Sequence, residues 1–307
     1  MRYQHAELKT WHTKCIAVPV QRKISPGEIA NMELTLLDLL TLLVVMLGTG
    51  CIAGITAGLF GVGGGFIVVP ALLTVFPFFD HFEEKHIYVA IGTSLATIIV
   101  SSARAVQAHS RTGSVDFLLL KDWAPWLVLG VVIGTALASV VNANSLLLVF
   151  ATGVFIYSFY FLLPKKFNIE GTSTEVPSGA GRAAIASGLG GFSALLGIGG
   201  GTPFVVTMTM CGRSFHQAIA TASGVGFIIA VPGAIGFLLI GLSDTNLPWG
   251  SIGYLNIPAL IAISIMSVFT APVGARLAHK LNDQMLKRAF GTYLFVISTS
   301  MFYKTLI

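Results

Sequence analysis

Apolar segments long enough to cross a lipid bilayer recur through this chain, and they constrain its fold more than any other feature. The hydrocarbon core of a bilayer is about 30 Å thick, which an apolar helix of about 20 residues can cross. Only 10% of the residues are charged, whereas a soluble domain carries about 25%. We assign seven spanning segments: Leu34–Phe60, Ile87–Ala103, Trp123–Val141, Leu146–Leu163, Gln217–Leu242, Ile252–Gly274 and Ala289–Phe302.

The fold class follows from how a chain must satisfy its backbone inside lipid. A spanning helix satisfies its own backbone hydrogen bonds, and no segment here alternates as barrel strands do. The sequence therefore predicts an all-α, multi-pass integral membrane protein of the cell membrane, which in a bacterium is the inner or plasma membrane. The lipid bilayer is then its first partner.

A glycine-rich sequence occurs twice and marks an internal repeat. Gly58–Gly65 reads GLFGVGGG, and Ala194–Gly201 reads ALLGIGGG. Each copy is followed by a short apolar run and by a similar helix start, AIGT at Ala90–Thr93 and AIAT at Ala218–Thr221. We predict two repeats of about five helices, each with a broken, re-entrant helix pair. The predicted divisions are a polar basic tail (1–33), a first transmembrane repeat (34–163), a linker loop (164–182) and a second transmembrane repeat (183–307).

The distribution of positive charge indicates that the second repeat is inverted relative to the first. Thr202–Cys211 has ten residues and spans only about 15 Å as a helix, half of the core. If each glycine turn closes a hairpin, 11 Lys and Arg residues after position 33 lie inside and 2 lie outside, as the positive-inside rule requires. Five helices per repeat is an odd number, so the repeats have opposite orientations. The basic tail does not fit this topology, which leaves open whether Met1 or Met32 is the native start.

The two glycine turns are the predicted substrate site. A non-helical turn at membrane depth is tolerated where it is buried in protein or lines a wet cavity. The short helices that follow would direct unpaired amide groups and positive dipole ends toward the bilayer centre, where they suit an anion. By contrast, Gly50, Gly54 and Gly58 form a four-residue ladder, which is typical of close helix packing. The predicted substrate-binding residues are Gly61, Gly63, Gly64, Gly65, Thr93, Ser94, Gly197, Gly199, Gly200, Gly201, Thr202, Thr221 and Ser223.

Several classes of function are disfavoured by what the sequence lacks. No Asp, Glu, Lys or Arg lies in the middle of a predicted span, so we expect no intramembrane carboxylate relay. The histidines, His86, His109, His216 and His279 among them, fall in loops or at helix ends, where we expect a solvated or lipid-headgroup role. The sequence predicts no catalytic residue, no metal site and no cofactor. The net charge of +5 is carried by loop residues and does not indicate nucleic-acid binding.

The doubled motif and its setting resemble the sulfite exporter TauE/SafE family of permeases. The resemblance covers roughly Met32–Ile307 and includes GARLAHKLNDQMLKRAFGTYL at Gly274–Leu294, which is similar to the last loop and helix of that family. It implies transport of sulfite, sulfoacetate, organic thiolates and related sulfur-containing anions. It does not name the substrate of this chain.

The leading hypothesis from the sequence is a secondary transporter, and an exporter, of small sulfur-containing anions bound between the two glycine turns. An anion leaving a negative cytoplasm gains about 2.3 kcal/mol per charge per 100 mV, so export needs no coupling ion. An anion channel and an importer of the same substrates are the alternatives. An intramembrane enzyme is disfavoured, because no histidine lies at the depth of Ser223. A homodimer is left open.

Overall fold

The computed structural model of the chain describes residues 36–78, 83–163 and 176–306. The chain divides into the stretch Met1–Leu39 and one compact unit, Leu40–Ile307, to which the contacts below belong. The predicted tail and most of the predicted linker lie outside the described residues.

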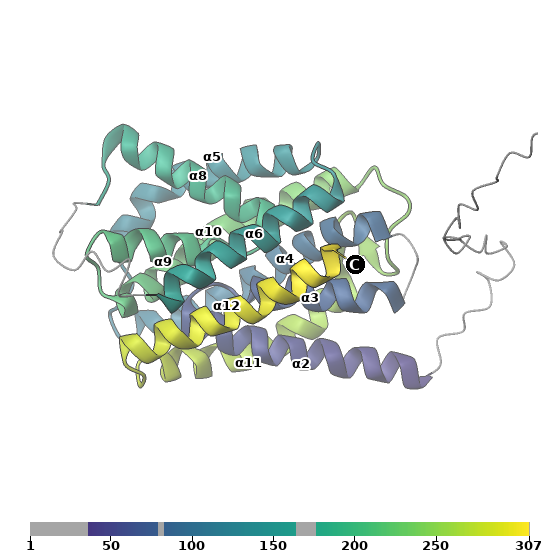
Figure 1. The fold of residues 1–307 in the computed structure, drawn as a ribbon, viewed down its shortest axis with the longest axis horizontal. Coiled ribbons are helices and arrows are strands. Elements are labelled where there is room, and N and C mark those ends of the chain that lie inside the picture. The colour runs from purple at the N-terminus through teal and green to yellow at the C-terminus, as the bar shows by residue number, and fades with distance from the viewer. Residues whose placement is uncertain (1–35, 79–82, 164–175, 307) are drawn as a thin grey trace, which may run out of the picture. The chain divides into compact units, whose positions relative to one another are not determined.

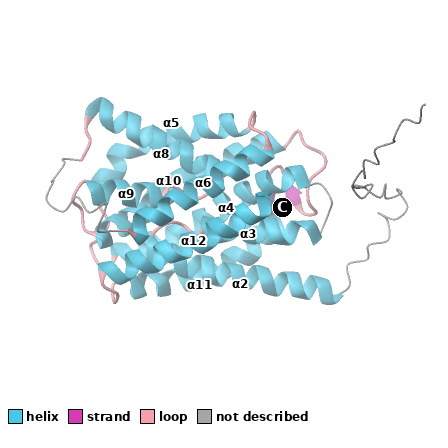
Figure 2. Cartoon of the chain, viewed as in Figure 1, coloured by secondary structure: helices cyan, strands magenta, loops and turns pink. Residues whose placement is uncertain are grey.

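Long and short helices follow one another in the predicted order (Figures 1 and 2). The first half contains α2 (Leu36–Phe60), α3 (Gly65–Val75), the 3-10 turn η1 (Phe76–Phe78), α4 (Glu83–Ser110), α5 (Phe117–Ala138) and α6 (Ala143–Leu162). The second half contains α8 (Gly179–Leu196), α9 (Gly201–Met210), α10 (Phe215–Gly241), α11 (Ile257–Ala278) and α12 (Asp283–Leu306). One antiparallel pair of short strands, β1 (Ser251–Ile252) and β2 (Leu255–Asn256), precedes α11.

Within the described residues, six helices are long and apolar enough to cross a membrane: α4, α5, α6, α10, α11 and the part of α2 from Leu40 onward. The seventh predicted span, Ala289–Phe302, forms part of α12 but is not among these six. The segment Gly65–Phe78 is a shorter apolar helix, as expected for a helix that follows a re-entrant turn. The all-α membrane fold predicted from the sequence is therefore confirmed.

The predicted start of one span was wrong. The apolar segment assigned from Ile252 begins as the β1–β2 hairpin, and the helix starts only at Ile257. Gly253, in the turn between the two strands, and Gly250, just before β1, have φ values of 54° and 77°, which residues with a side chain rarely adopt. The Asn256 side chain then caps α11 by accepting a hydrogen bond from the Ala259 amide at 3.0 Å. Hydropathy alone does not predict the hairpin or the N-cap, so it places the start of the helix too early.

The two halves interlock through close helix pairs. α5 packs along α8, α6 along α12, and α4 along both α10 and α11. α2 and α11 meet through the predicted glycine ladder: a methyl group on Gly54 would lie 2.7 Å from the Cα of Ser267, and one on Gly58 would lie 2.6 Å from the Ala275 amide nitrogen. Only glycine permits this approach. The prediction that this ladder serves helix packing is confirmed.

The central helices α4 and α10 are antiparallel. Lys85, at the start of α4, forms an ion pair at 2.9 Å with Asp244, which follows the end of α10. At the other end Asp116, beyond the end of α4, donates its amide hydrogen to the Thr221 hydroxyl, near the start of α10, at 3.1 Å. Since α4 has 28 residues, these two contacts are about 40 Å apart. How the halves are oriented in a membrane stays a prediction.

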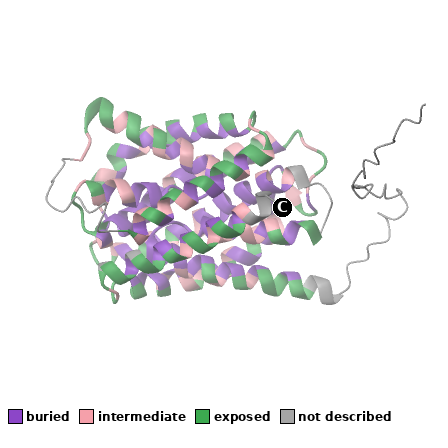
Figure 3. Ribbon diagram, viewed as in Figure 1, coloured by how far each residue is buried: buried purple, intermediate pink, exposed green. Residues whose placement is uncertain are grey.

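The interior of the protein is mostly apolar and contains a smaller set of buried polar side chains (Figure 3 shows which residues are buried). α4 is the most buried span, with 72% of its most apolar window inside the protein, against 33% for α11. The outer helices expose large apolar side chains such as Val44, Ile133 and Phe269. Exposed apolar side chains on helices of this length suit contact with lipid. The hydroxyl groups of α4 are turned inward: Thr93, Ser94, Thr97, Ser101 and Ser102 are all buried.

Candidate functional site

Two left-handed glycine turns break the chain before α3 and before α9. Gly61, Gly63 and Gly64 have φ values of 67°, 72° and 79°, and Gly197, Gly199 and Gly200 have 66°, 65° and 73°. Gly64 and Gly200 are the N-cap residues of the short helices, with no side chain available to cap them. Each short helix therefore begins with amide groups that have no acceptor within the helix.

The two turns are in direct backbone contact with each other. A methyl group on Gly65 would lie 2.8 Å from the Cα of Ile198 and would overlap the carbonyl oxygen of Gly197. On the matching Gly201 it would lie 2.5 Å from the Cα of Val62 and would overlap the carbonyl oxygen of Gly61. We call this contact the glycine crossing, formed by residues 61–65 and 197–201. A methyl group does not fit there, so the crossing is closed to solutes in this conformation.

Each turn also packs on the central helix of the other half. A methyl group on Gly61 would lie 3.2 Å from the Cα of Ile219 on α10, and one on Gly197 would lie 3.1 Å from the Cα of Ile91 on α4. Hydroxyl groups of α4 hold the turns in place. Ser94 donates to the carbonyl oxygen of Gly197 at 2.8 Å, and Ser101 donates to that of Gly63 at 2.9 Å.

Three fully buried hydroxyl groups beside the crossing have no hydrogen-bond partner among the described residues. They belong to Ser102 on α4, Ser193 on α8 and Thr202 on α9. The Ser102 oxygen would lie 3.2 Å from a methyl group on Gly63 and 2.8 Å from one on Gly226; the Ser193 oxygen would lie 3.2 Å from one on Gly200. An unpaired buried hydroxyl costs about 1–3 kcal/mol. Three such groups around one motif indicate that something other than protein satisfies them.

The predicted hydroxyl residues divide into those that the protein itself uses and those that remain available. Ser94 holds the second turn, and Ser223 donates to the Ile219 carbonyl of its own helix at 3.2 Å. Thr93 accepts a hydrogen bond from the amide of Asn256 at 2.8 Å, and Thr221 accepts one from Asp116. Thr202 is unpaired. The structure brings Thr202 and Ser94 to the crossing, whereas Thr93 and Thr221 join the central helices to the caps of α11 and α5.

The expectation that the histidines are solvated was wrong for two of them. His86 and His109 are 3% and 1% exposed. The Nε2 atom of His109 lies 2.9 Å from the carbonyl oxygen of Gly58, and its Nδ1 atom lies 3.2 Å from Nε2 of His279. A helix end that faces other helices buries its side chains as fully as a core position does. His109 thereby joins α2, α4 and the end of α11.

Sequence reasoning missed Ser102 and Ser193. Ser193 stands four residues before Gly197, one helical turn from the motif, and this spacing could have drawn attention to it. Ser102 carries no such signal, because only the folded α4 brings it to Gly63. Chemically, the crossing offers hydroxyl donors and helix N-termini, and no charged side chain is among the nearest atoms of the described part of the chain, which is a setting for binding an anion rather than for acid–base chemistry.

Comparison with known proteins indicates a membrane transporter. A family model described as "Sulfite exporter TauE/SafE" matches residues 46–301. A probable membrane transporter protein of Haemophilus influenzae is 31% identical over 86% of this chain and 99% of its own length. Probable membrane transporter proteins of Methanocaldococcus jannaschii and Bacillus subtilis (YunE) are each 24% identical, over 89% and 85% of this chain and 99% and 97% of their own lengths. No solved structure matches. With most of its length matched, this multi-pass membrane protein belongs to the TauE/SafE family of membrane transporters.

Proposed function

We propose that this transporter is an exporter of small sulfur-containing anions, such as sulfite, sulfoacetate or organic thiolates, and that the anion passes through the glycine crossing. The observation that carries the proposal is the set of unpaired buried hydroxyls on Ser102, Ser193 and Thr202 around the two turns. Hydroxyl and amide donors bind oxyanions well when water is excluded.

The closed crossing fits a carrier that works by alternating access. The two turns have to separate before an anion reaches the hydroxyl groups, because the backbones of Gly65 and Ile198 touch. The antiparallel central helices support an inverted arrangement of the halves, in which the same movement can occur on either side. An importer would use the same path in reverse, and a channel would need the crossing to stay open.

Removing each unpaired hydroxyl tests the proposal. In Ser102→Ala, Ser193→Ala and Thr202→Val no protein hydrogen bond is lost, so the melting temperature of the purified protein should not fall. A hydrogen bond to a charged group contributes about 1.5–3 kcal/mol, so uptake of radiolabelled sulfite by proteoliposomes should fall about 10-fold or more in kcat/KM. These are sharper changes than Gly200→Leu, which would also collide with Ile229 and Ser193.

Ser267→Ala on α11 is the matched control. The Ser267 hydroxyl is equally buried but donates to the Ile263 carbonyl of its own helix at 2.8 Å, so its loss should leave transport near the wild-type rate. Full transport in all three test variants would remove the proposed site. Unitary currents in a planar bilayer, in place of saturable exchange, would identify a channel.

A further inference from the structure

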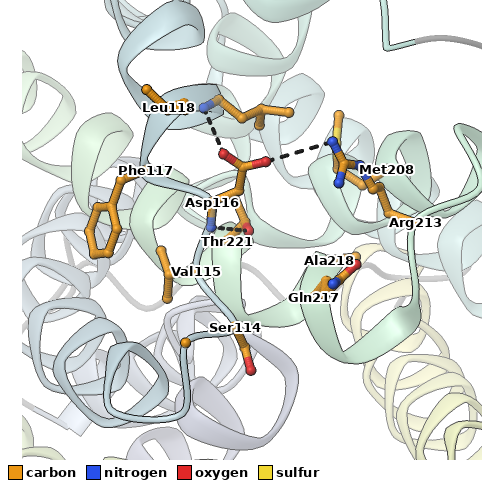
Figure 4. Close-up of a pocket in the computed structure, with 12 residues that line it drawn as sticks. Ser114, Val115, Asp116, Phe117, Leu118, Met208, Arg213, Gln217, Ala218 and Thr221 are labelled. Carbon is orange, nitrogen blue, oxygen red and sulfur yellow. Dashed lines mark hydrogen bonds and ion pairs between the residues drawn. The ribbon is translucent and has the colours of Figure 1, made fainter.

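A pocket of about 370 Å³ opens beside the starts of α5 and α10. Its polar lining comes from Ser114, Asp116, Arg213, Gln217 and Thr221 (Figure 4). The carboxylate of Asp116 and the guanidinium of Arg213 point toward each other across it, with Thr221 next to the Asp116 backbone. This pocket, which we call the Arg213 pocket, is distinct from the glycine crossing, and Thr221 is the one predicted substrate-binding residue in its lining.

The polar groups of the pocket lead inward along one side of α10. Gln217 and Thr221 are four residues apart on α10, so they lie one above the other, and Arg213 lies just outside the helix, before its N-cap residue Ser214. Exposure falls along this line, from an exposed Arg213 to Thr221 at 4%. Ala218 also lines the pocket, and its neighbour Ile219 touches Gly61 of the first glycine turn. The inner end of the pocket is therefore adjacent to the crossing.

The electrostatics of the pocket favour an anion once one carboxylate is displaced. Arg213 and Asp116 are 3.7 Å apart, with 46% and 37% of their side chains exposed, which makes a loose and solvated ion pair. Asp116 also caps α5 by accepting the Leu119 amide hydrogen at 3.0 Å. The N-termini of α5 and α10 both open here. Two helix dipoles and one guanidinium outweigh a single carboxylate that already has a partner.

The matching position in the other half has a cavity of about 770 Å³ beside Lys85, but this cavity does not reach Thr93, the counterpart of Thr221. Lys85 precedes Thr93 by eight residues, as Arg213 precedes Thr221. Lys85 is paired with Asp244 at 2.9 Å, and Asp244 also accepts a hydrogen bond from Tyr254. Tyr254 stacks on Tyr88 with ring centroids 5.3 Å apart, and Tyr88 donates to the Val141 carbonyl at 2.6 Å. The cavity beside Lys85 is lined by Tyr88 and Asn142 and not by Thr93.

We propose that the Arg213 pocket is the entrance site for the transported oxyanion, where Arg213 and Gln217 bind it in place of the Asp116 carboxylate, and that the cluster of Lys85, Asp244 and Tyr254 is the corresponding entrance in its closed state. This inference rests on the proposed transport function. It identifies the conformation as one that is open at the Arg213 end and closed at the Lys85 end. In the predicted topology the open end faces the cytoplasm, as loading for export requires.

Binding of sodium sulfite to the purified full-length protein in detergent tests the entrance site. A ligand that binds the native state raises the melting temperature in a saturable way. At constant ionic strength, Arg213→Gln should raise the half-saturating sulfite concentration at least 10-fold, and Arg213→Lys should raise it less. Asp116→Asn keeps a good N-cap residue and removes the competing charge, so it should lower that concentration. Arg182→Gln, which removes a cation paired with Asp122 at 3.4 Å, should leave it unchanged.

Transport by the same variants separates this inference from the proposed function. Arg213→Gln should raise the KM for sulfite loaded from the Arg213 side at least 10-fold and change the maximal rate less than 2-fold. A wild-type protein that transports sulfite, with Arg213→Gln indistinguishable from it in both binding and KM, would overturn the entrance site alone. A wild-type protein that transports none of the sulfur-containing anions would overturn the proposed function instead.

Discussion

At the scale of single residues, a hydroxyl group is informative only once its partner is known. Ser94 and Ser102 are both fully buried on α4, yet Ser94 fixes the second glycine turn while Ser102 has no partner among the described residues. Composition and spacing do not show which buried hydroxyl lacks a partner. The prediction from the sequence therefore included Ser94 and omitted Ser102, which carries the stronger evidence for a bound solute.

His279 gives a residue-scale prediction about pH. Burial lowers the pKa of His279, and the nearby His216 lowers it further; His109 and Thr112 also face its ring. Because the native pKa is below that of the unfolded chain, the unfolded state binds the proton more readily. The stability that His279 contributes is therefore present above about pH 6.5 and is lost as the pH falls.

Thermal unfolding of the purified protein between pH 8 and pH 5 checks this prediction. The wild type should lose melting temperature on the acid side of this range, and His279→Gln should lose less of it. An identical pH profile in the two proteins would show that protonation of His279 does not affect the stability of the protein.

At the scale of elements, glycine spacing determines which helices can touch. The four-residue ladder of α2 meets α11, and Gly130 of α5 likewise meets α8, where a methyl group would lie 2.7 Å from the Cα of Ser187. The triple glycines act differently, because positive φ at Gly63, Gly64, Gly199 and Gly200 reverses the chain. Spacing therefore separates a packing glycine from a turn glycine, and both interpretations made from the sequence agree with these contacts.

Gly58 and Gly48 of α2 give an element-scale prediction with an internal control. A methyl group on Gly58 would collide with the backbone of α11, whereas one on Gly48 would meet nothing within 4 Å. We expect Gly58→Ala to destabilise the protein by about 1–3 kcal/mol and Gly48→Ala to stabilise it by up to about 1 kcal/mol, because alanine is the better helix former. The melting temperatures of the two variants, measured in one detergent, check both expectations. Equal melting temperatures would contradict the packing assigned to α2 and α11.

At the scale of the whole molecule, the two ends differ although the halves repeat. Hydrogen bonding to Tyr254 and then the charge of Lys85 hold the pKa of Asp244 below its usual value against the opposing effect of burial, so the closed end keeps its ion pair at neutral pH. The Arg213 end has a looser pair and a pocket that reaches Thr221, whereas the cavity beside Lys85 does not reach Thr93. A protein with similar halves and one open end is what alternating access requires of a single conformation.

A prediction at this scale compares the accessibility of the two ends. Val89 and Gln217 occupy matching positions, four residues before Thr93 and Thr221. In a background without Cys15, Cys51 and Cys211, Gln217→Cys should react with N-ethylmaleimide at least 10-fold faster than Val89→Cys, because Gln217 is exposed in the pocket and Val89 is fully buried.

Adding Tyr254→Phe should accelerate labelling at position 89 by weakening the closed end. It should leave position 217 unchanged. Equal rates at the two positions, before and after this change, would mean that the ends are not in different states.

The sequence by itself determined the membrane class, the helix order, the doubled glycine turn and the family, because hydropathy, chain reversal at glycine and repeated motifs are properties of local sequence. The tertiary structure decided what meets at the turns. Contact between Gly65 and Ile198, the isolation of the Ser102 hydroxyl and the pairing of Lys85 with Asp244 join residues far apart in the chain. Such contacts depend on how whole helices pack, and no local pattern encodes which polar group is left without a partner.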